Sequence, residues 1–119
     1  MSIAIVDDDE AVREATKTLV RSLGYNASMF ASAEEFLNSE QFSNTSCLIT
    51  DLHMPGLSGL DLQDQLIARG HRIPVIFMTA CPEENARTRA MKAGAIGFLS
   101  KPFNDDQLLG YLEKTLKAT

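Results

Sequence analysis

Polar residues stand where four apolar, strand-like segments of this 119-residue sequence end. They are Asp7, Asp8, Asp51, Thr79 and Lys101. In an open α/β sheet the carboxyl ends of the parallel strands meet at one edge, and ligands bind beyond that edge. One polar residue at a strand end is common. Polar residues at four strand ends of one small domain indicate a functional site.

Three carboxylates that converge at such an edge would repel one another. At roughly 5 Å and an effective dielectric of 20, each pair costs about 3 kcal/mol, and Lys101 supplies only one positive charge. Mg²⁺ is a suitable counter-ion, because it prefers oxygen ligands and few carboxylates. A carboxylate beside Mg²⁺, a hydroxyl and a lysine is typical of phosphoryl transfer, in which an aspartate can act as the nucleophile.

Five strands that alternate with five helices would place these residues at one edge. The strands are expected at Ile3–Val6, Tyr25–Phe30, Cys47–Asp51, Ile73–Met78 and Ile96–Ser100. Short, mostly apolar runs are typical of strands that are covered on both faces. The alternation predicts an α/β fold, a doubly wound parallel sheet with helices on both faces and right-handed crossovers. Residues 1–119 would form one domain.

Apolar residues at helical spacing mark four of the helices, and a capping box at Ser32–Glu35 opens the short second helix. The residues expected to face the core are Val12, Ala15, Leu19 and Leu23 in the first helix, Leu62, Leu66 and Ile67 in the third, Ala86, Ala90 and Met91 in the fourth, and Leu108, Leu109, Leu112 and Leu116 in the last. Gly24, Gly70 and Gly94 would end three helices, and Asn104 would cap the last. The fourth helix, at about 83–93, has the weakest apolar face and should be loosely held.

The composition excludes several classes of protein. Hydrophobic residues make up 45% and charged residues 23%, which is ordinary for a soluble domain. The net charge of −5 argues against direct contact of this domain with nucleic acid or with an anionic membrane. No apolar run approaches the roughly 18 residues of a membrane span. A strand that begins at Ile3 leaves no room for a signal peptide, so we expect a cytoplasmic protein.

The two cysteines, Cys47 and Cys81, are expected to be reduced thiols. They would lie at opposite ends of neighbouring strands, about 15 Å apart at roughly 3.3 Å per residue. That distance is too long for a disulfide. Core packing is the favoured role for Cys47.

Four motifs occur in a fixed order along the chain: IVDDDE, DLHMPGLSG, MTA and GFLSKPF. Together they resemble the receiver domain of bacterial two-component response regulators, and most closely the FixJ-type class. The resemblance covers essentially the whole chain. It implies a flavodoxin-like sheet in the order 2-1-3-4-5. It also implies a switch, which accepts a phosphoryl group from a sensor histidine kinase on Asp51.

The resemblance assigns the metal ligands as well. Asp7 and Asp8 would form the acidic pair that binds Mg²⁺, with Asp8 the closer ligand. Asp51 and the backbone carbonyl of His53 would complete the protein's share of the coordination. The side chains of His53 and Cys81 would flank the acceptor, where a role in phosphate lifetime stays open. Asp9 is better explained as an N-cap of the first helix.

The resemblance implies further roles around the phosphate. Thr79 would bind a phosphoryl oxygen, Lys101 would pair with the phosphate, and Phe98 would be the aromatic residue of the switch. Ala80 matches the small residue that leaves the acceptor accessible. The peptide bond between Lys101 and Pro102 resembles a cis peptide of the family.

Phosphorylation is then expected to change a surface built from the fourth helix, the fifth strand and the fifth helix. FixJ-type relatives dimerise through this surface, so we expect a phosphorylation-dependent homodimer, with Thr88 and Lys92 as contacts. The output would be control of a DNA-binding effector and hence of transcription. FixJ-type regulators usually continue into such a domain. This sequence ends at Thr119, so it is either an excised or a stand-alone receiver. The domain would not be an enzyme, although it catalyses its own phosphorylation and dephosphorylation.

Three other classes fit the residues less well. A phosphatase of the haloacid-dehalogenase type would carry its nucleophile in a D-x-D motif after the first strand, where this sequence has adjacent aspartates. A phosphorylation-independent interaction module would not need Asp51, Thr79 and Lys101 together. A nucleotide-binding fold would need a glycine-rich first turn, which the sequence lacks.

Overall fold

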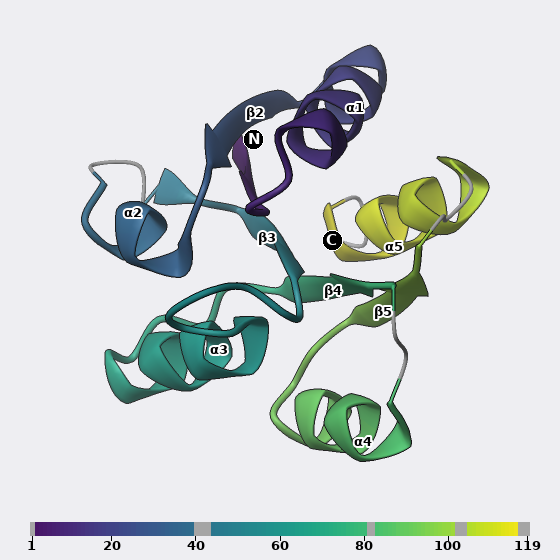
Figure 1. Ribbon diagram of the computed structural model, residues 1–119. Helices are drawn as coiled ribbons and strands as arrows, with labels where there is room; N and C mark the ends of the chain where they lie inside the picture. The colour runs from purple at the N-terminus through teal and green to yellow at the C-terminus, as the bar shows by residue number, and fades with distance from the viewer. Residues whose placement is uncertain (1, 40–43, 81–82, 102–104, 117–119) are drawn as a thin grey trace.

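One parallel sheet of five strands forms the centre of the protein (Figure 1). The computed structural model describes residues 2–39, 44–80, 83–101 and 105–116. The elements are β1 (Ser2–Val6), α1 (Glu10–Ser22), β2 (Asn26–Phe30), α2 (Ala33–Leu37), β3 (Cys47–Asp51), α3 (Gly59–Ala68), β4 (Val75–Thr79), α4 (Glu84–Lys92), β5 (Gly97–Ser100) and α5 (Asp105–Leu116). The strand order is β2-β1-β3-β4-β5. The predicted fold and strand order are confirmed.

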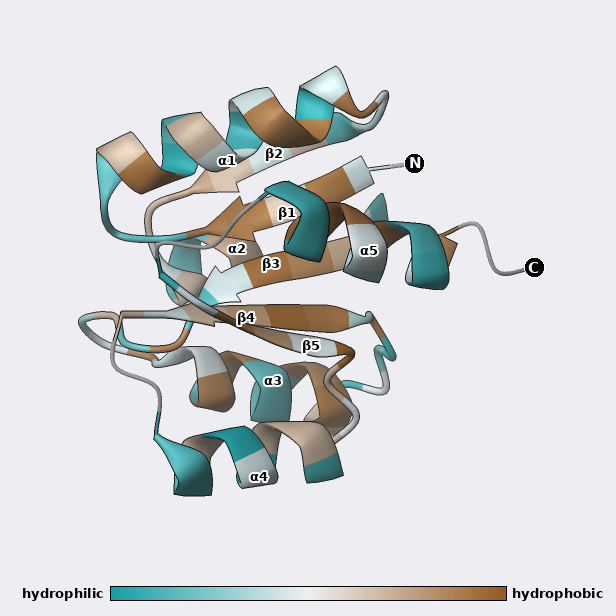
Figure 2. Cartoon of the chain, turned by 90° about the vertical axis from the view of Figure 1, so that its right-hand side faces the viewer, coloured by the Kyte–Doolittle hydropathy of each residue, from teal (hydrophilic) through white to brown (hydrophobic). Residues whose placement is uncertain are grey.

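Two layers of helices cover the sheet (Figure 2). Helices α1 and α5 lie on one face, and α2, α3 and α4 lie on the other (Figures 1 and 2). Alternate strand residues serve the two cores, as in β1, where Ile3 and Ile5 pack on the α1/α5 side and Ala4 and Val6 on the opposite side. Both faces are apolar because both are covered. The candidate site residues therefore gather at the edge of the sheet and not on a face.

Strand β4 begins two residues later than predicted, at Val75, and it includes Thr79. Pro74 has no N–H to donate to the ladder. Its carbonyl still accepts a hydrogen bond from Leu48 N at 2.9 Å. The other strands begin within one residue of the predicted position, which is the usual uncertainty of a strand end. The shift makes Thr79 the last residue of β4, beside the end of β3.

The predicted helix faces are right for most residues and wrong at three positions. Ala15 is exposed, and Ile67 and Met91 are 53% and 43% exposed. In α1 the buried residues are Thr16 and Val20. Thr16 can be buried because its hydroxyl donates to the Val12 carbonyl at 2.8 Å. Helix α4 has Ala90 as its buried residue, in agreement with a weakly held helix.

Different residues fix the helix ends at the two edges of the sheet. Gly24, Gly70 and Gly94 have φ values of 94°, 77° and 101°, so they end their helices in the conformation that glycine favours, at the edge opposite the site. Ser58 forms a capping box with Asp61 at the start of α3. No helix among the described residues has the length and apolar character that a membrane crossing requires.

Candidate functional site

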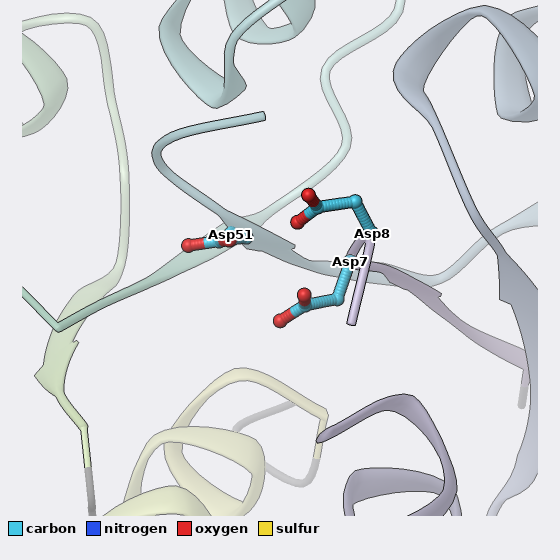
Figure 3. Close-up of side chains that lie close together, drawn as sticks. All are labelled: Asp7, Asp8 and Asp51. Carbon is cyan, nitrogen blue, oxygen red and sulfur yellow. The ribbon is translucent and has the colours of Figure 1, made fainter. Parts of the chain in front are cut away.

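Three aspartates converge at the carboxyl edge of the sheet (Figure 3). Asp7 and Asp8 directly follow β1, and Asp51 is the last residue of β3, which pairs with β1. One oxygen atom from each carboxylate lies within 4.8 Å of the other two. Asp7 and Asp51 are buried, whereas Asp8 is exposed. This set of hard oxygen donors could hold a metal ion, and one of its members faces the solvent.

Lys101 brings a positive charge into the cluster from the end of β5. Its Nζ lies 2.9 Å from Asp7 Oδ2 and 3.5 Å from Asp51 Oδ1. Its backbone N–H donates to the Thr79 carbonyl at 2.7 Å, which holds the chain at this point. One ammonium faces three carboxylates, so the cluster keeps a net charge of about −2, and a divalent cation would balance it.

Hydrogen bonds to its carboxylate and to its backbone carbonyl hold Asp7 in place. Its Oδ1 accepts a hydrogen bond from Asp9 N at 2.9 Å, and its Oδ2 accepts from Lys101. Arg13 Nη1 donates to the Asp7 carbonyl at 2.8 Å. The Asp9 carboxylate accepts from the backbone N–H groups of Ala11 and Val12, so Asp9 is the N-cap of α1. Sequence reasoning did not find Arg13, because nothing in a helical pattern indicates that an arginine returns to the preceding loop.

The electrostatics of the cluster raise the pKa of Asp51 above its usual value. Burial is the largest cause, and the charge of Asp7 adds to it. The charge of Lys101 and the backbone N–H of His53 lower the pKa, and Asp8 contributes a smaller rise. Burial alone would lower the pKa of Lys101, but the hydrogen bond and charge of Asp7, with the charge of Asp51, raise it. Asp51 is therefore a partly shielded carboxylate that needs more positive charge than the protein supplies.

Thr79 lies on β4, which pairs with the strand of Asp51, and Phe98 lies on β5, one strand further out. Thr79 is fully buried at the end of β4, where its register partner is Ser100 of β5. Phe98 is half-buried, and its ring centroid lies 6.1 Å from that of Phe77. Phe98 also lines a hollow of about 290 Å³ between α4 and α5. An aromatic ring between the core and a hollow has space to change its rotamer.

The hollow also shows which residues of α4 face α5. Its lining residues are Glu83, Glu84, Arg87, Phe98, Ser100, Gln107 and Tyr111. Thr88 and Lys92, which the sequence suggested as dimer contacts, line another hollow together with Arg89, and their role in a dimer stays a prediction. Sequence spacing could place Thr88 and Lys92 on one side of the helix, but it could not show which side faces α5.

His53 lies at the mouth of the site. Its Nε2 is 3.6 Å from Glu83 Oε1, and both side chains are more than half exposed, at 54% and 60%. Ala80, directly after Thr79, is exposed. Glu83 was not identified from the sequence, because its place opposite His53 depends on the path of the chain before α4.

Cys47 is fully buried in β3, and this burial raises the pKa of its thiol to about 12. The thiol is therefore neutral, and the predicted packing role of Cys47 is confirmed. The predictions for Cys81, for the bond between Lys101 and Pro102, and for the Asn104 cap fall on residues outside the described ranges.

The fold and the site together define a parallel α/β domain with an acidic, metal-competent edge. Residues 3–113 match the family model described as the response regulator receiver domain. Response regulator protein TodT of Pseudomonas putida is 46% identical over 115 residues, which are 97% of this chain and 51% of that protein. Transcriptional regulatory protein FixJ of Bradyrhizobium diazoefficiens is 34% identical over 97% of this chain and 56% of its own length.

Solved structures give the same result. The response regulator StyR superposes with a TM-score of 0.90 at 43% identity, over 98% of this chain and 59% of that chain. The structure titled FixJ-N has a TM-score of 0.86 at 33% identity, over 99% and 94% of the two chains. This chain belongs to the receiver domain family of response regulators, so the resemblance drawn from its motifs is confirmed. It spans about half the length of the curated relatives that it matches.

Proposed function

We propose that this receiver domain is the phosphorylation-dependent switch of a two-component system and that Asp51 accepts the phosphoryl group from a sensor histidine kinase. The observation that carries the proposal is the convergence of Asp7, Asp8, Asp51 and Lys101 at one edge of the sheet. As the phosphorus–nitrogen bond of a phosphohistidine breaks, a carboxylate oxygen of Asp51 forms the new bond to phosphorus. Residues 1–119 act as one receiver domain in this proposal.

Asp7, Asp8, Asp51 and the backbone carbonyl of His53 are the groups that would hold Mg²⁺. When bound, Mg²⁺ would supply positive charge that neutralises the transferring phosphoryl group. Lys101 adds a second positive charge close to Asp51 and pairs with the phosphoryl oxygens. The Thr79 hydroxyl donates to another of these oxygens. The backbone N–H of His53, which already donates to Asp51, holds the nucleophile in place.

The proposal is tested with the protein and a small phosphoryl donor. Incubation with acetyl phosphate and Mg²⁺ should add one phosphoryl group, seen by intact mass as an adduct that survives acid and is lost in base. A chelator that removes Mg²⁺ should prevent the addition. An unchanged mass with Mg²⁺ present, for a protein that is folded by circular dichroism, would contradict the proposal.

Replacing Lys101 with alanine should separate phosphorylation from its conformational response. The variant still has Asp51 and the acidic pair, so it should accept phosphate, but more slowly than the wild type. Without the ammonium, no group at the end of β5 attracts the new charge. We expect small chemical-shift changes in α4 and β5 when the variant is phosphorylated. Changes as large as those of the wild type would contradict this role of Lys101.

The output is a change of the surface formed by α4, β5 and α5. Thr79 moves toward a phosphoryl oxygen, and Phe98 rotates into the space that this movement opens. Helix α4 shifts readily because it buries so little apolar surface. The changed surface pairs with a second copy and so controls a DNA-binding effector. Relatives described as transcriptional regulators support this output.

Activated protein should form a weak symmetric dimer, seen by light scattering at increasing concentration in the presence of beryllofluoride. Arg87 lines the hollow between α4 and α5 with Glu84, so we place it in the dimer contact. Replacing Arg87 with glutamate should weaken the dimer at least about tenfold, because like charges would then meet across the interface. Lys17→Glu makes a comparable charge reversal on α1, outside this surface, and should dimerise normally. A monomer at millimolar concentration would rule out dimerisation as the output.

The domain is proposed to act in the cytoplasm and to bind proteins rather than nucleic acid or membrane. The acidic charge of the domain supports an absence of direct contact with nucleic acid or membrane. We place the domain in the cytoplasm, where a sensor histidine kinase could transfer its phosphoryl group to Asp51. The domain has no other substrate in this proposal and is not an enzyme in that sense, although it catalyses the gain and loss of its own phosphoryl group.

A further inference from the structure

Helix α4 is anchored differently at its two ends. At its N-terminal end, the capping residue Glu83 makes no side-chain hydrogen bond to the backbone N–H groups of the first turn. The side chain of Glu83 instead lies near His53, at the mouth of the site. Ala90, one turn from the C-terminal end, is the buried residue of the helix, and Ala86 is half-buried. The apolar contacts are too few to fix this helix firmly.

Gln63 supplies a polar contact at the C-terminal end of α4. It lies on α3, next to α4 on the same face of the sheet (Figures 1 and 2), and it is only 4% exposed. Its Nε2 donates to the Ala90 carbonyl at 3.2 Å. The same carbonyl accepts from Ala95 N at 3.0 Å. Carbonyls in the last turn of a helix lack partners inside the helix. Gln63 therefore helps to cap α4 from a neighbouring helix.

The hydrogen bond from Gln63 matters for the contact between α3 and α4, because little else holds the two helices together at this end. A hollow of about 370 Å³ lies beside it, lined by Gln63 and Ile67 of α3 and by Ala93 and Gly94 after α4. Apolar packing between the ends of the two helices is interrupted there. The neighbouring ion pair between Arg89 and Asp64 is more than half exposed, and exposed pairs contribute little to stability. The buried Gln63 amide is thus the stronger of these two polar links.

We propose that Gln63 is the positioning residue that holds the C-terminal end of α4, so that the helix responds to the site by moving its N-terminal end. This inference rests on the proposed shift of α4. It further specifies that the C-terminal end of α4 stays in place and that Gln63 holds this end. The end that moves is the end beside His53 and the Phe98 hollow.

The first test concerns the resting protein and needs no phosphorylation. Gln63→Met keeps a similar volume but removes the donor, and Gln65→Met makes the same change at an exposed position of α3. In Gln63→Met, amide exchange at Ala93, Gly94 and Ala95 should be about three- to tenfold faster than in wild type, as expected for one lost hydrogen bond. Gln65→Met should exchange as wild type does. Equal exchange in both variants would overturn the inference.

The second test uses nuclear Overhauser effects in protein activated with beryllofluoride and Mg²⁺. Contacts between the Gln63 side-chain amide protons and Ala90 should persist, while contacts of the first turn of α4 change. Loss of the Gln63–Ala90 contacts, with changes along the whole helix, would overturn this inference and leave the proposed function standing. If no contact of α4 changes at all, the proposed output and this inference fail together.

Discussion

Replacing Asp51 with asparagine should abolish the phosphate adduct completely while leaving the fold intact. An amide has no negative charge and is not a nucleophile toward phosphorus. Asp51 lies at the end of β3 with its carboxylate in the cluster, so the isosteric change removes the acceptor without opening a cavity. Intact mass after incubation with acetyl phosphate and Mg²⁺ measures the result. Asp9→Asn is the matched control, because Asp9 caps α1 and should be labelled normally. Full labelling of Asp51→Asn would show that another residue is the acceptor.

The same variant should change the pH dependence of stability in the metal-free protein. Folding raises the pKa of Asp51 from 3.8, first by burial and then by the charge of Asp7. Between the unfolded and folded pKa values, the folded protein holds a proton that the unfolded chain has released. The free energy of unfolding therefore falls as the pH rises through that interval. Urea unfolding with a chelator present should show this fall in wild type and a smaller one in Asp51→Asn.

Replacing Asp8 with asparagine should weaken Mg²⁺ binding by about 10- to 100-fold. Loss of a group that only supports a metal ligand already costs that much, so loss of a charged ligand should cost at least as much. Asp8 is exposed and is the member of the cluster that faces solvent, so the change should not disturb the core. Calorimetric titration with Mg²⁺ measures the affinity.

Asp9→Asn is again the control, since it removes one negative charge from the same run of aspartates and asparagine is a good N-cap. Both variants lower the net negative charge equally. Equal affinities for Mg²⁺ in the two variants would show that Asp8 acts through its charge at a distance and not as a ligand.

The edge of the sheet could be predicted from the sequence because parallel strands end on the same side. Asp7, Asp8, Asp51 and Lys101 each end or follow an apolar run, and the alternation of elements was enough to bring them together. The start of β4 could also have been placed better, since Pro74 cannot donate to the ladder.

What could not be predicted depends on how the helices pack. Gln63 looks like a solvent-facing residue of α3, and only the position of α4 makes it a buried donor. Ile67 looks like a core residue, but it lies beside a hollow where the two helices do not pack closely. In α4, Arg87 lines the hollow beside α5 whereas Lys92 lines another hollow, and the helical spacing alone could not separate the two.

Gly59 shows how tightly the loop after Asp51 is packed. Its N–H donates to the Leu52 carbonyl at 2.9 Å, and a side chain there would collide with the carbonyl oxygen of Asp51. The first turn of α3 thus packs directly against the backbone of Asp51. Replacement of Gly59 by any larger residue would have to displace one of the two.

The ion pair between Lys101 and Asp7 joins residues that are 94 positions apart in the chain. A ribosome makes Asp7 long before Lys101, and β1 lies inside the sheet, where it pairs with β3, which is made later. A nascent or truncated chain that stops before β5 therefore carries Asp7 and Asp51 without their ammonium partner. Truncation before β5 would therefore leave the repulsion among the three carboxylates without this counter-charge.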